Sequence, residues 1–358
     1  MKVRLLVTGT CLKFLWLMFC IFLFSTFIAY AGTLTYLSAS CLAIDPLAPT
    51  TIYAGTRSGV FKSTDGGDSW TQVSTGLTDL LVASLAINPS TANIIYARTW
   101  VGGVFKSSNR GDSWTQVSTE LTARDVLDLV IDPSTPDTIY AGTWYGEVFK
   151  SSNGGDSWTE VSTGLIDLPV ACLAMDPLTP DTVYAGTQYG GVFKSTNGGD
   201  SWAQVSTELA GLSVDFLVID PLTPATVYAG IWNGGIYKST NKGDSWLEVG
   251  TGLTGRQINS LAIDPLTPTT VYAATRYGGV FKTTNGGDNW TAVSTGLTDL
   301  CVLSLAIDPL TPDTVYAGTQ YGGVFKSTNG GNSWTVVNTG LTDEMSVAYT
   351  LSAKRYAL

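Results

Sequence analysis

The sequence contains no histidine. This absence excludes Ser-His-Asp and Cys-His nucleophilic catalysis, and it excludes metal sites built on imidazole. Pairs of carboxylates can hydrolyse glycosidic bonds without histidine, so glycoside chemistry is still open. We predict no metal site and no cofactor for this chain.

Basic residues are also scarce, with 19 Lys and Arg against 29 Asp and Glu. Three of the 19 lie before residue 32, so the rest of the chain has 16 basic and 29 acidic residues and a net charge of −13. A charge of this sign argues against binding to nucleic acid or to anionic membrane surfaces. It is compatible with a neutral glycan or a basic protein as partner.

Residues 1–31 are typical of a secretory signal peptide. Lys2, Arg4 and Lys13 precede an apolar run over 14–28, and Ala29-Tyr30-Ala31 provides a small-x-small cleavage site. We therefore predict cleavage after Ala31, a secreted or periplasmic protein over 32–358, and no stable membrane insertion afterwards. The alternative is an uncleaved anchor, because the run is close to the lower limit for spanning a bilayer.

Cysteine is rare outside this leader. Cys41, Cys172 and Cys301 are the three that would remain after cleavage. Cys41 and Cys172 occupy the same position in two distant copies of the repeat described next. A bond between them is therefore disfavoured by distance, and we expect three free thiols.

No window shows a sustained helical period, and instead one unit is written seven times. The copies start at Leu42, Leu85, Leu129, Leu173, Leu217, Leu261 and Leu305, at an interval of 43 and then 44 residues. A fixed period of this length is typical of solenoids and propellers. The copies at 173–202 and 305–334 differ only at Met175/Ile307 and Asp200/Asn332, which indicates recent duplication.

Each unit reads as four short strands, which we call A to D. They end in or contain sequences such as LAID, TVYAG, GVFKS and SWTQVS, and Pro, Gly, Asn or Asp bound each one. Seven units of four antiparallel strands predict an all-β, seven-bladed β-propeller over 32–358, which we expect to be a monomer. A β-solenoid is the alternative, although its coils are usually shorter.

A motif of the form Ser-x-Asp/Asn-x-Gly-x-x-Trp recurs in register in every unit. Its third position holds Asp65, Asn109, Asn153, Asn197, Asn241, Asn285 and Asn329, and its last holds Trp70, Trp114, Trp158, Trp202, Trp246, Trp290 and Trp334. We expect the Asp or Asn to bond amides of its own turn and the Trp to be a buried anchor between blades. The carboxylate spacing of a calcium loop is missing.

This motif resembles the Asp-box (BNR) repeat, and the resemblance covers nearly all of 42–340. The family includes sialidases, xyloglucan-cleaving glycosidases, sortilin-type receptor ectodomains and lumenal photosystem II assembly factors. The chain lacks the Arg-Ile-Pro motif of sialidases. The xyloglucanase type uses one catalytic Asp in each of two tandem propellers, and only one propeller is predicted here. Asp125, Asp128, Glu147 and Asp215 are the acids left as catalytic candidates.

Strand alternation predicts which end of each blade carries the variable residues. The A–B turns and the boxes should share one uniform rim, and the B–C turns and the D–A links should share the other. The column at the B–C turn reads Arg57, Trp100, Trp144, Gln188, Trp232, Arg276 and Gln320, with Tyr145 and Tyr189 beside it. Aromatic faces stack on sugars and anchor proteins, so we predict a ligand-binding face here. The alternative is that these side chains pack flat against the neighbouring blade.

Two functional hypotheses follow. The first is an exported, non-enzymatic propeller that binds a protein or glycan through this rim. The second is a glycosidase-like hydrolase. We also expect the C-terminal segment over 345–358 to dock near the first blade and help to close the ring, because an unpaired apolar edge is a liability.

Overall fold

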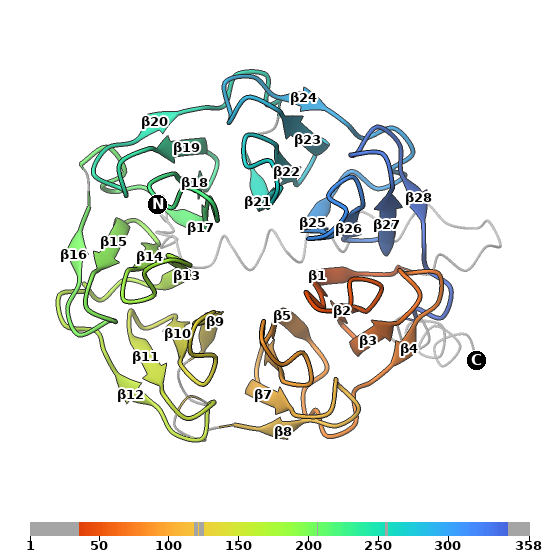
Figure 1. The fold of residues 1–358 in the computed structure, drawn as a ribbon, viewed down its shortest axis with the longest axis horizontal. Helices are drawn as coiled ribbons and strands as arrows, with labels where there is room; N and C mark the ends of the chain where they lie inside the picture. The colour runs from red at the N-terminus through yellow and green to blue at the C-terminus, as the bar shows by residue number, and fades with distance from the viewer. Residues whose placement is uncertain (1–35, 118–120, 122–124, 206, 255–256, 343–358) are drawn as a thin grey trace, which may run out of the picture. The chain divides into compact units, whose positions relative to one another are not determined.

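The protein is a seven-bladed β-propeller. The computed structural model describes residues 36–117, 121, 125–205, 207–254 and 257–342, and these contain 28 strands and no α-helix. The strands form seven four-stranded antiparallel sheets, each built from one repeat in chain order. The sheets are arranged in a ring, with the first strand of each nearest to the centre of the ring (Figure 1). The predicted fold class is therefore confirmed, and the β-solenoid is wrong.

The first two strands of each blade form its inner half. The A strands are β1 (Ala39–Ile44), β5 (Val82–Ile87), β9 (Val126–Ile131), β13 (Val170–Met175), β17 (Val214–Ile219), β21 (Ile258–Ile263) and β25 (Val302–Ile307). The B strands are β2 (Ile52–Thr56), β6 (Ile95–Thr99), β10 (Ile139–Thr143), β14 (Val183–Thr187), β18 (Val227–Ile231), β22 (Val271–Thr275) and β26 (Val315–Thr319).

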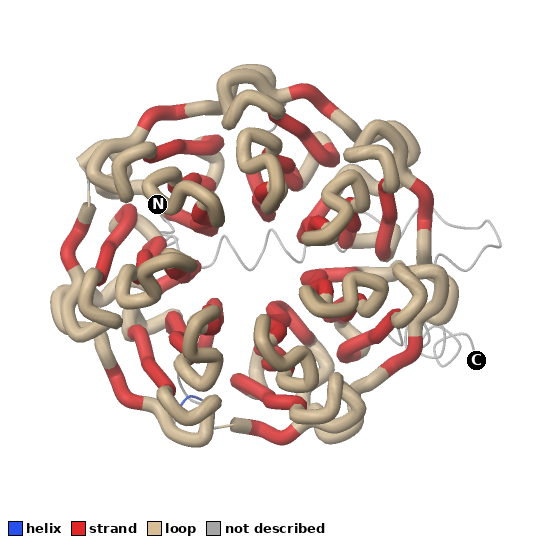
Figure 2. Tube along the Cα trace, in the orientation of Figure 1, coloured by secondary structure: helices blue, strands red, loops and turns tan. Residues whose placement is uncertain are grey.

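The outer half of each blade tapers to a strand of two residues. The C strands are β3 (Gly59–Ser63), β7 (Gly103–Ser107), β11 (Val148–Ser151), β15 (Gly191–Ser195), β19 (Gly235–Ser239), β23 (Gly279–Thr283) and β27 (Val324–Ser327). The D strands are β4 (Thr71–Gln72), β8 (Thr115–Gln116), β12 (Thr159–Glu160), β16 (Ala203–Gln204), β20 (Leu247–Glu248), β24 (Thr291–Ala292) and β28 (Thr335–Val336). Most of the remaining described chain is turn and link (Figure 2).

The motif around each Trp closes a local turn, as predicted. In the second blade the Ser107 hydroxyl donates to Asn109 Oδ1 and accepts from the Gly111 amide, while Asn109 Oδ1 accepts from the Ser113 amide. The last of these bonds recurs in all seven turns. The seven Trp are 3–8 % exposed, so their predicted burial is confirmed.

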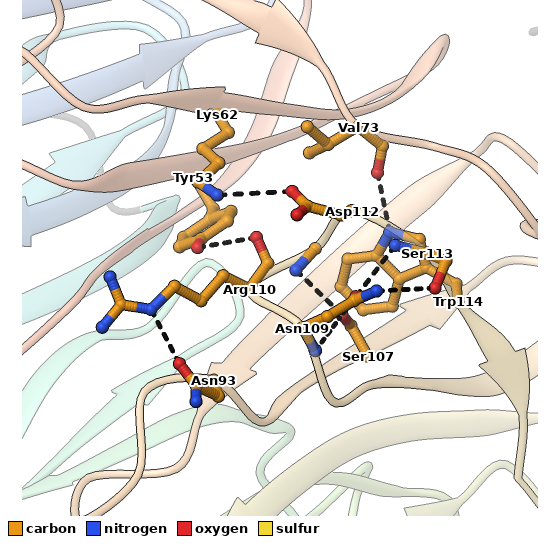
Figure 3. A network of polar contacts seen from close by, with 11 residues as sticks. Tyr53, Lys62, Val73, Asn93, Ser107, Asn109, Arg110, Asp112, Ser113 and Trp114 are labelled. Carbon is orange, nitrogen blue, oxygen red and sulfur yellow. Dashed lines mark hydrogen bonds and ion pairs between the residues drawn. The ribbon is translucent and has the colours of Figure 1, made fainter.

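The same turn also joins neighbouring blades. Figure 3 shows this junction between the first and second blades: Tyr53 donates from its hydroxyl to Arg110 O (3.0 Å), and Trp114 Nε1 donates to Val73 O (2.7 Å). In six blades the Lys of strand C donates to the carbonyl at the Arg110 position of the next blade. Lys62 instead pairs with Asp112 (3.5 Å). Each repeat therefore contributes both halves of an interlock that holds the ring.

The two rims have the predicted composition. The turn carrying each box bonds to the A–B turn of its own blade, as in Gly66 N to Thr50 O (2.8 Å). At the other rim, the B–C turn bonds to the link that enters the same blade, as in Trp100 N to Leu81 O (3.0 Å). The variable B–C column and the variable links therefore lie together.

The ring closes within a D–A link that is split between the two ends of the described chain. Trp70 N donates to Thr339 O (2.8 Å), as at an ordinary junction, and Leu37 exchanges backbone bonds with Tyr321 and Gly323. Leu37 thereby replaces the leucine of an ordinary link, because Gly191 and Gly279 donate to Leu212 and Leu300 in the same way. The C-terminal segment predicted to assist closure lies outside the described residues.

Candidate functional site

The three indoles of the B–C column are exposed. Trp100, Trp144 and Trp232 are 67 %, 48 % and 49 % accessible, so burial between blades is excluded for them. Tyr145 and Tyr189 are exposed as well. Of the remaining predicted residues, Arg57 is exposed and Gln188, Arg276 and Gln320 are half-buried. Whether any of these side chains binds a ligand stays a prediction.

A cavity of about 600 Å³ is lined by four consecutive blades of the ring. It brings together the column residues Arg276, Gln320, Arg57 and Trp100, from the sixth, seventh, first and second blades. Its volume is in the range of small-molecule sites. The other five predicted residues, Trp144, Gln188, Trp232, Tyr145 and Tyr189, do not line it. Part of the predicted face thus lines this cavity, which we call the channel pocket, and the other predicted residues lie outside it.

Arg98 is the charged pocket residue that the sequence analysis did not single out. It lies on β6, in a column that is Gly in five other blades and Ala274 in the sixth blade. A Cβ at Gly55 or Gly186 in this column would lie within 2.4 Å of a cysteine sulfur. In the second blade the residue opposite is Ser84, which is small and leaves room. The sequence feature that could have identified Arg98 is a long basic side chain at a position where the other repeats have Gly or Ala.

The side chain of Arg98 is half-buried and poorly satisfied. Its one hydrogen bond within the described residues runs from Nη1 to Val126 O at 3.3 Å, and its Nε is buried without an acceptor there. It lies 5.9 Å from the ring centre of Trp100. Burial lowers the pKa of Arg98, and the negative charge of Asp128 opposes that shift. The side chain nevertheless stays cationic, because arginine does not deprotonate in proteins.

Amides and hydroxyls complete the wall of the pocket. Asn259 donates from Nδ2 to Val302 O (2.8 Å), and the Cys301 thiol donates to Gln320 Oε1 (2.9 Å). These bonds orient the two amides. Asn259 Oδ1 and Gln320 Nε2 take no part in these two bonds. Ser38 and Ser40 also line the pocket.

Carboxylates in the links hold the B–C turns in place. Asp79 Oδ2 accepts from the amides of Val101 (2.8 Å) and Gly102 (3.2 Å), beside Trp100. Asp299 Oδ2 accepts in the same way from Tyr321 (2.7 Å) and Gly322 (3.2 Å). The residues that position the pocket therefore come from the links, which vary between blades.

The four acids proposed as catalytic candidates do not line this pocket. Asp128 accepts from Leu173 N of the next blade (2.9 Å), and Glu147 accepts from Thr143 Oγ1 (2.9 Å), so both have structural partners. Burial raises the pKa of Asp128 and of Asp215 to about 6. Asp125 has a positive φ of 46° and accepts from Trp144 N through its carbonyl.

Cysteines and metal ligands give no further site. Cys41, Cys172 and Cys301 are free thiols, as predicted, and burial raises the pKa of each. Within the part of the chain that the structure describes, no group of three or more Cys, Asp or Glu is arranged to hold a metal ion. No helix among those residues is long and apolar enough to cross a membrane.

Comparison with known proteins identifies the architecture. No family model and no curated protein matches the sequence. Among solved structures, the GH74 xyloglucanase from Xanthomonas campestris is similar (TM-score 0.73, 18 % identity), over 87 % of this chain and 55 % of the enzyme. The extracellular domain of the putative one-component system BT4673 from B. thetaiotaomicron is similar at TM-score 0.64 and 20 % identity, over 84 % and 39 %. YCF48 bound to D1 peptide is similar at TM-score 0.61 and 15 % identity, over 84 % and 98 %.

These likenesses show the fold alone, because every identity is below a quarter. The chain spans about half the length of the xyloglucanase that it matches, at 55 % of that enzyme. It spans nearly all of YCF48, at 98 %. Such propellers occur as hydrolases, as extracellular domains and as peptide-binding proteins.

Proposed function

We propose that this chain is an exported, non-enzymatic Asp-box propeller that binds a protein or glycan ligand on the rim of B–C turns and D–A links. The observation that carries the proposal is the channel pocket, which combines an exposed indole with arginine and amide side chains in one cavity of about 600 Å³. Binding sites are usually concave, with a few convergent polar groups of this kind. Export is supported by the predicted signal peptide over 1–31, and structural neighbours include extracellular domains.

The contrast between the two rims supports the same proposal. The box rim repeats one local geometry in every blade, and its polar groups bond to one another or to the next blade. The opposite rim differs from blade to blade in residue type. A ligand without sevenfold symmetry would contact such a surface, whereas a purely structural requirement would select one residue type in all blades.

The test is binding by the protein expressed from the full chain, on a glycan array and in pull-downs from an envelope fraction. Replacing Trp100, Trp144 and Trp232 together by Ala should abolish binding and leave the melting midpoint unchanged. A matched control replaces Leu178, Leu222 and Leu310, which are exposed apolar residues on the opposite rim, and it should bind normally. Equal binding by both triple variants would refute the proposed face.

Hydrolysis is the alternative to binding, because three of the similar structures are GH74 enzymes. Chromogenic glycosides separate the two functions. Turnover that is lost in Asp128→Asn or Asp215→Asn would favour the hydrolase, whereas binding without turnover favours the proposal.

A further inference from the structure

The channel pocket has a charge opposite to that of the chain around it. Arg57, Arg98 and Arg276 line it, and none of the described residues that line it is Asp or Glu. The whole sequence nevertheless has a net charge of −10. Three of its few arginines are therefore gathered around one cavity. Positive charge in a concave site focuses the field and attracts anions.

Arg98 adds an energetic reason for an anion. A half-buried cation without strong partners favours an added acceptor, because hydrogen bonds to charged groups are stronger than those between neutral groups. Within the described residues its guanidinium makes one hydrogen bond, at 3.3 Å, although arginine carries five N–H donors. Asp128 compensates part of the charge at a distance and makes its own hydrogen bonds to Leu129 and Leu173. A carboxylate in the pocket would supply the missing acceptor, in the planar geometry that guanidinium prefers.

The uncharged groups indicate what else the ligand carries. Trp100 is 67 % exposed and offers an indole surface, and Asn259, Gln320, Ser38 and Ser40 offer amide and hydroxyl groups. An aromatic platform with several amides and hydroxyls matches a ring that has one apolar face and many hydroxyls. A peptide would instead be expected to use deep apolar anchor pockets or an open strand edge.

We propose that the channel pocket binds a carboxylated saccharide of the uronic acid class, with Arg98 and Arg57 on the carboxylate and Trp100 against the sugar ring. This inference rests on the proposed binding function and specifies its ligand.

The test is calorimetric titration of the full chain's product with trigalacturonate and with its methyl ester, which has the same rings and no charge. The acid should bind at least about tenfold more tightly than the ester, as expected for one charge-assisted hydrogen bond or more. Raising sodium chloride from about 50 to about 300 mM should weaken binding of the acid and not of the ester.

The chain supplies matched variants for this experiment. Arg98→Gly restores the glycine of five other blades, and it should weaken binding of trigalacturonate at least about tenfold. Arg110→Gly removes an arginine of the same blade on the opposite rim, where five other blades have Gly at this position with a positive φ, and should leave binding unchanged. Arg98→Gln and Arg57→Gln remove charge with smaller structural change, and Gln already occupies the Arg57 column at Gln188 and Gln320.

Each outcome decides the matter. Equal affinity for acid and ester, unchanged binding in both Arg98 variants, or no binding of trigalacturonate would overturn the proposal. Tighter binding of an acidic tetrapeptide than of trigalacturonate would assign the pocket to peptides and would also overturn it. If a neutral glycan binds and the triple Trp variant loses that binding, the proposed function stands and only the acidic specificity fails.

Discussion

At the scale of single residues, the repeats act as controls for one another. Asp45 is fully buried, and its Oδ2 has no hydrogen-bond partner within the described residues. The equivalent oxygen of Asp176 accepts from Thr179 Oγ1 (2.7 Å). The first blade has Ala48 where all six other blades have Thr. The missing threonine hydroxyl at Ala48 therefore explains the unpaired Oδ2 atom of Asp45.

Ala48→Thr should stabilise the protein by about 1 kcal/mol, because it supplies a partner for a buried charged oxygen. The measurement is the free energy of unfolding in urea. Thr179→Ala is the matched control and should cost a similar amount, since it creates the same defect in the fourth blade. A destabilised Ala48→Thr variant would show that the site cannot accommodate the larger side chain.

Asp215 is predicted to make stability depend on pH. Burial raises its pKa to about 6, above the value of ~3.9 for an unfolded chain. The folded state therefore favours the protonated carboxyl. This contribution to stability is complete below about pH 4 and is lost as the pH rises through about 6.

Asp215→Asn removes this titration. The free energy of unfolding of the variant should exceed that of the wild type by about 1 kcal/mol at pH 8, a figure reduced for partial solvent exposure. At pH 4 the two free energies should be equal. Unfolding midpoints at the two pH values test this. A constant difference between the proteins at both pH values would contradict the titration.

At the scale of elements, the D–A links decide how well neighbouring blades interlock. In five links a glycine with φ near 90° lies under the Trp of the next blade, and at Gly252 a Cβ would come within 2.3 Å of Trp290 O. The links leaving the second and fourth blades have Glu120 and Glu208 instead. There the indoles of Trp158 and Trp246 donate to their own boxes, at Gly155 O and Gly243 O, and not to the preceding blade.

Gly252→Ala should destabilise the protein by about 2 kcal/mol or more, because it combines a left-handed backbone with a clash against a carbonyl. Glu208→Ala is the control at the equivalent, exposed position and should change stability by less than about 0.5 kcal/mol. Urea unfolding of both variants gives the comparison. Similar small effects at both positions would mean that the link relaxes without cost.

At the scale of the whole molecule, the ring closes because the last blade contacts the first much as blades adjacent in sequence contact each other. The junction between the last and first blades has the Tyr and Lys bonds that most other junctions have, from Tyr316 and Lys326 to Gly66 O (2.9 and 2.8 Å). Leu37 completes the link from the other side, and Tyr36 packs edge-on against Tyr321 at 5.4 Å. The seam therefore depends on a few residues before β1.

Leu37→Pro should lower the free energy of unfolding by about 1–2 kcal/mol, because proline cannot donate the bond to Tyr321 O. Leu37→Ala keeps the amide and loses only side-chain packing, so the difference between the two variants isolates the backbone bond. Equal midpoints for the two variants would show that the bridge does not hold the seam.

The blade itself follows from the sequence alone. Turn residues at a fixed period define the strands. Seven in-register copies define the number of blades, because each copy makes its Tyr, Lys and Trp contacts with a neighbouring copy. The assignment of Trp100 and Arg57 to the variable rim also follows, since strand alternation decides the end at which each turn lies.

Only the tertiary structure decided which of those residues meet. The sixth, seventh, first and second blades become neighbours through closure, so the pocket joins Arg276 to Trp100 across the two ends of the described chain. The turns at Tyr189 and Tyr321 have the same local sequence, yet only Tyr189 has a positive φ, because Asp299 and Leu37 hold the other turn. Local sequence cannot specify such contacts. Arg98 is a pocket residue for the same physical reason: its side chain finds space only where neighbouring blades leave it.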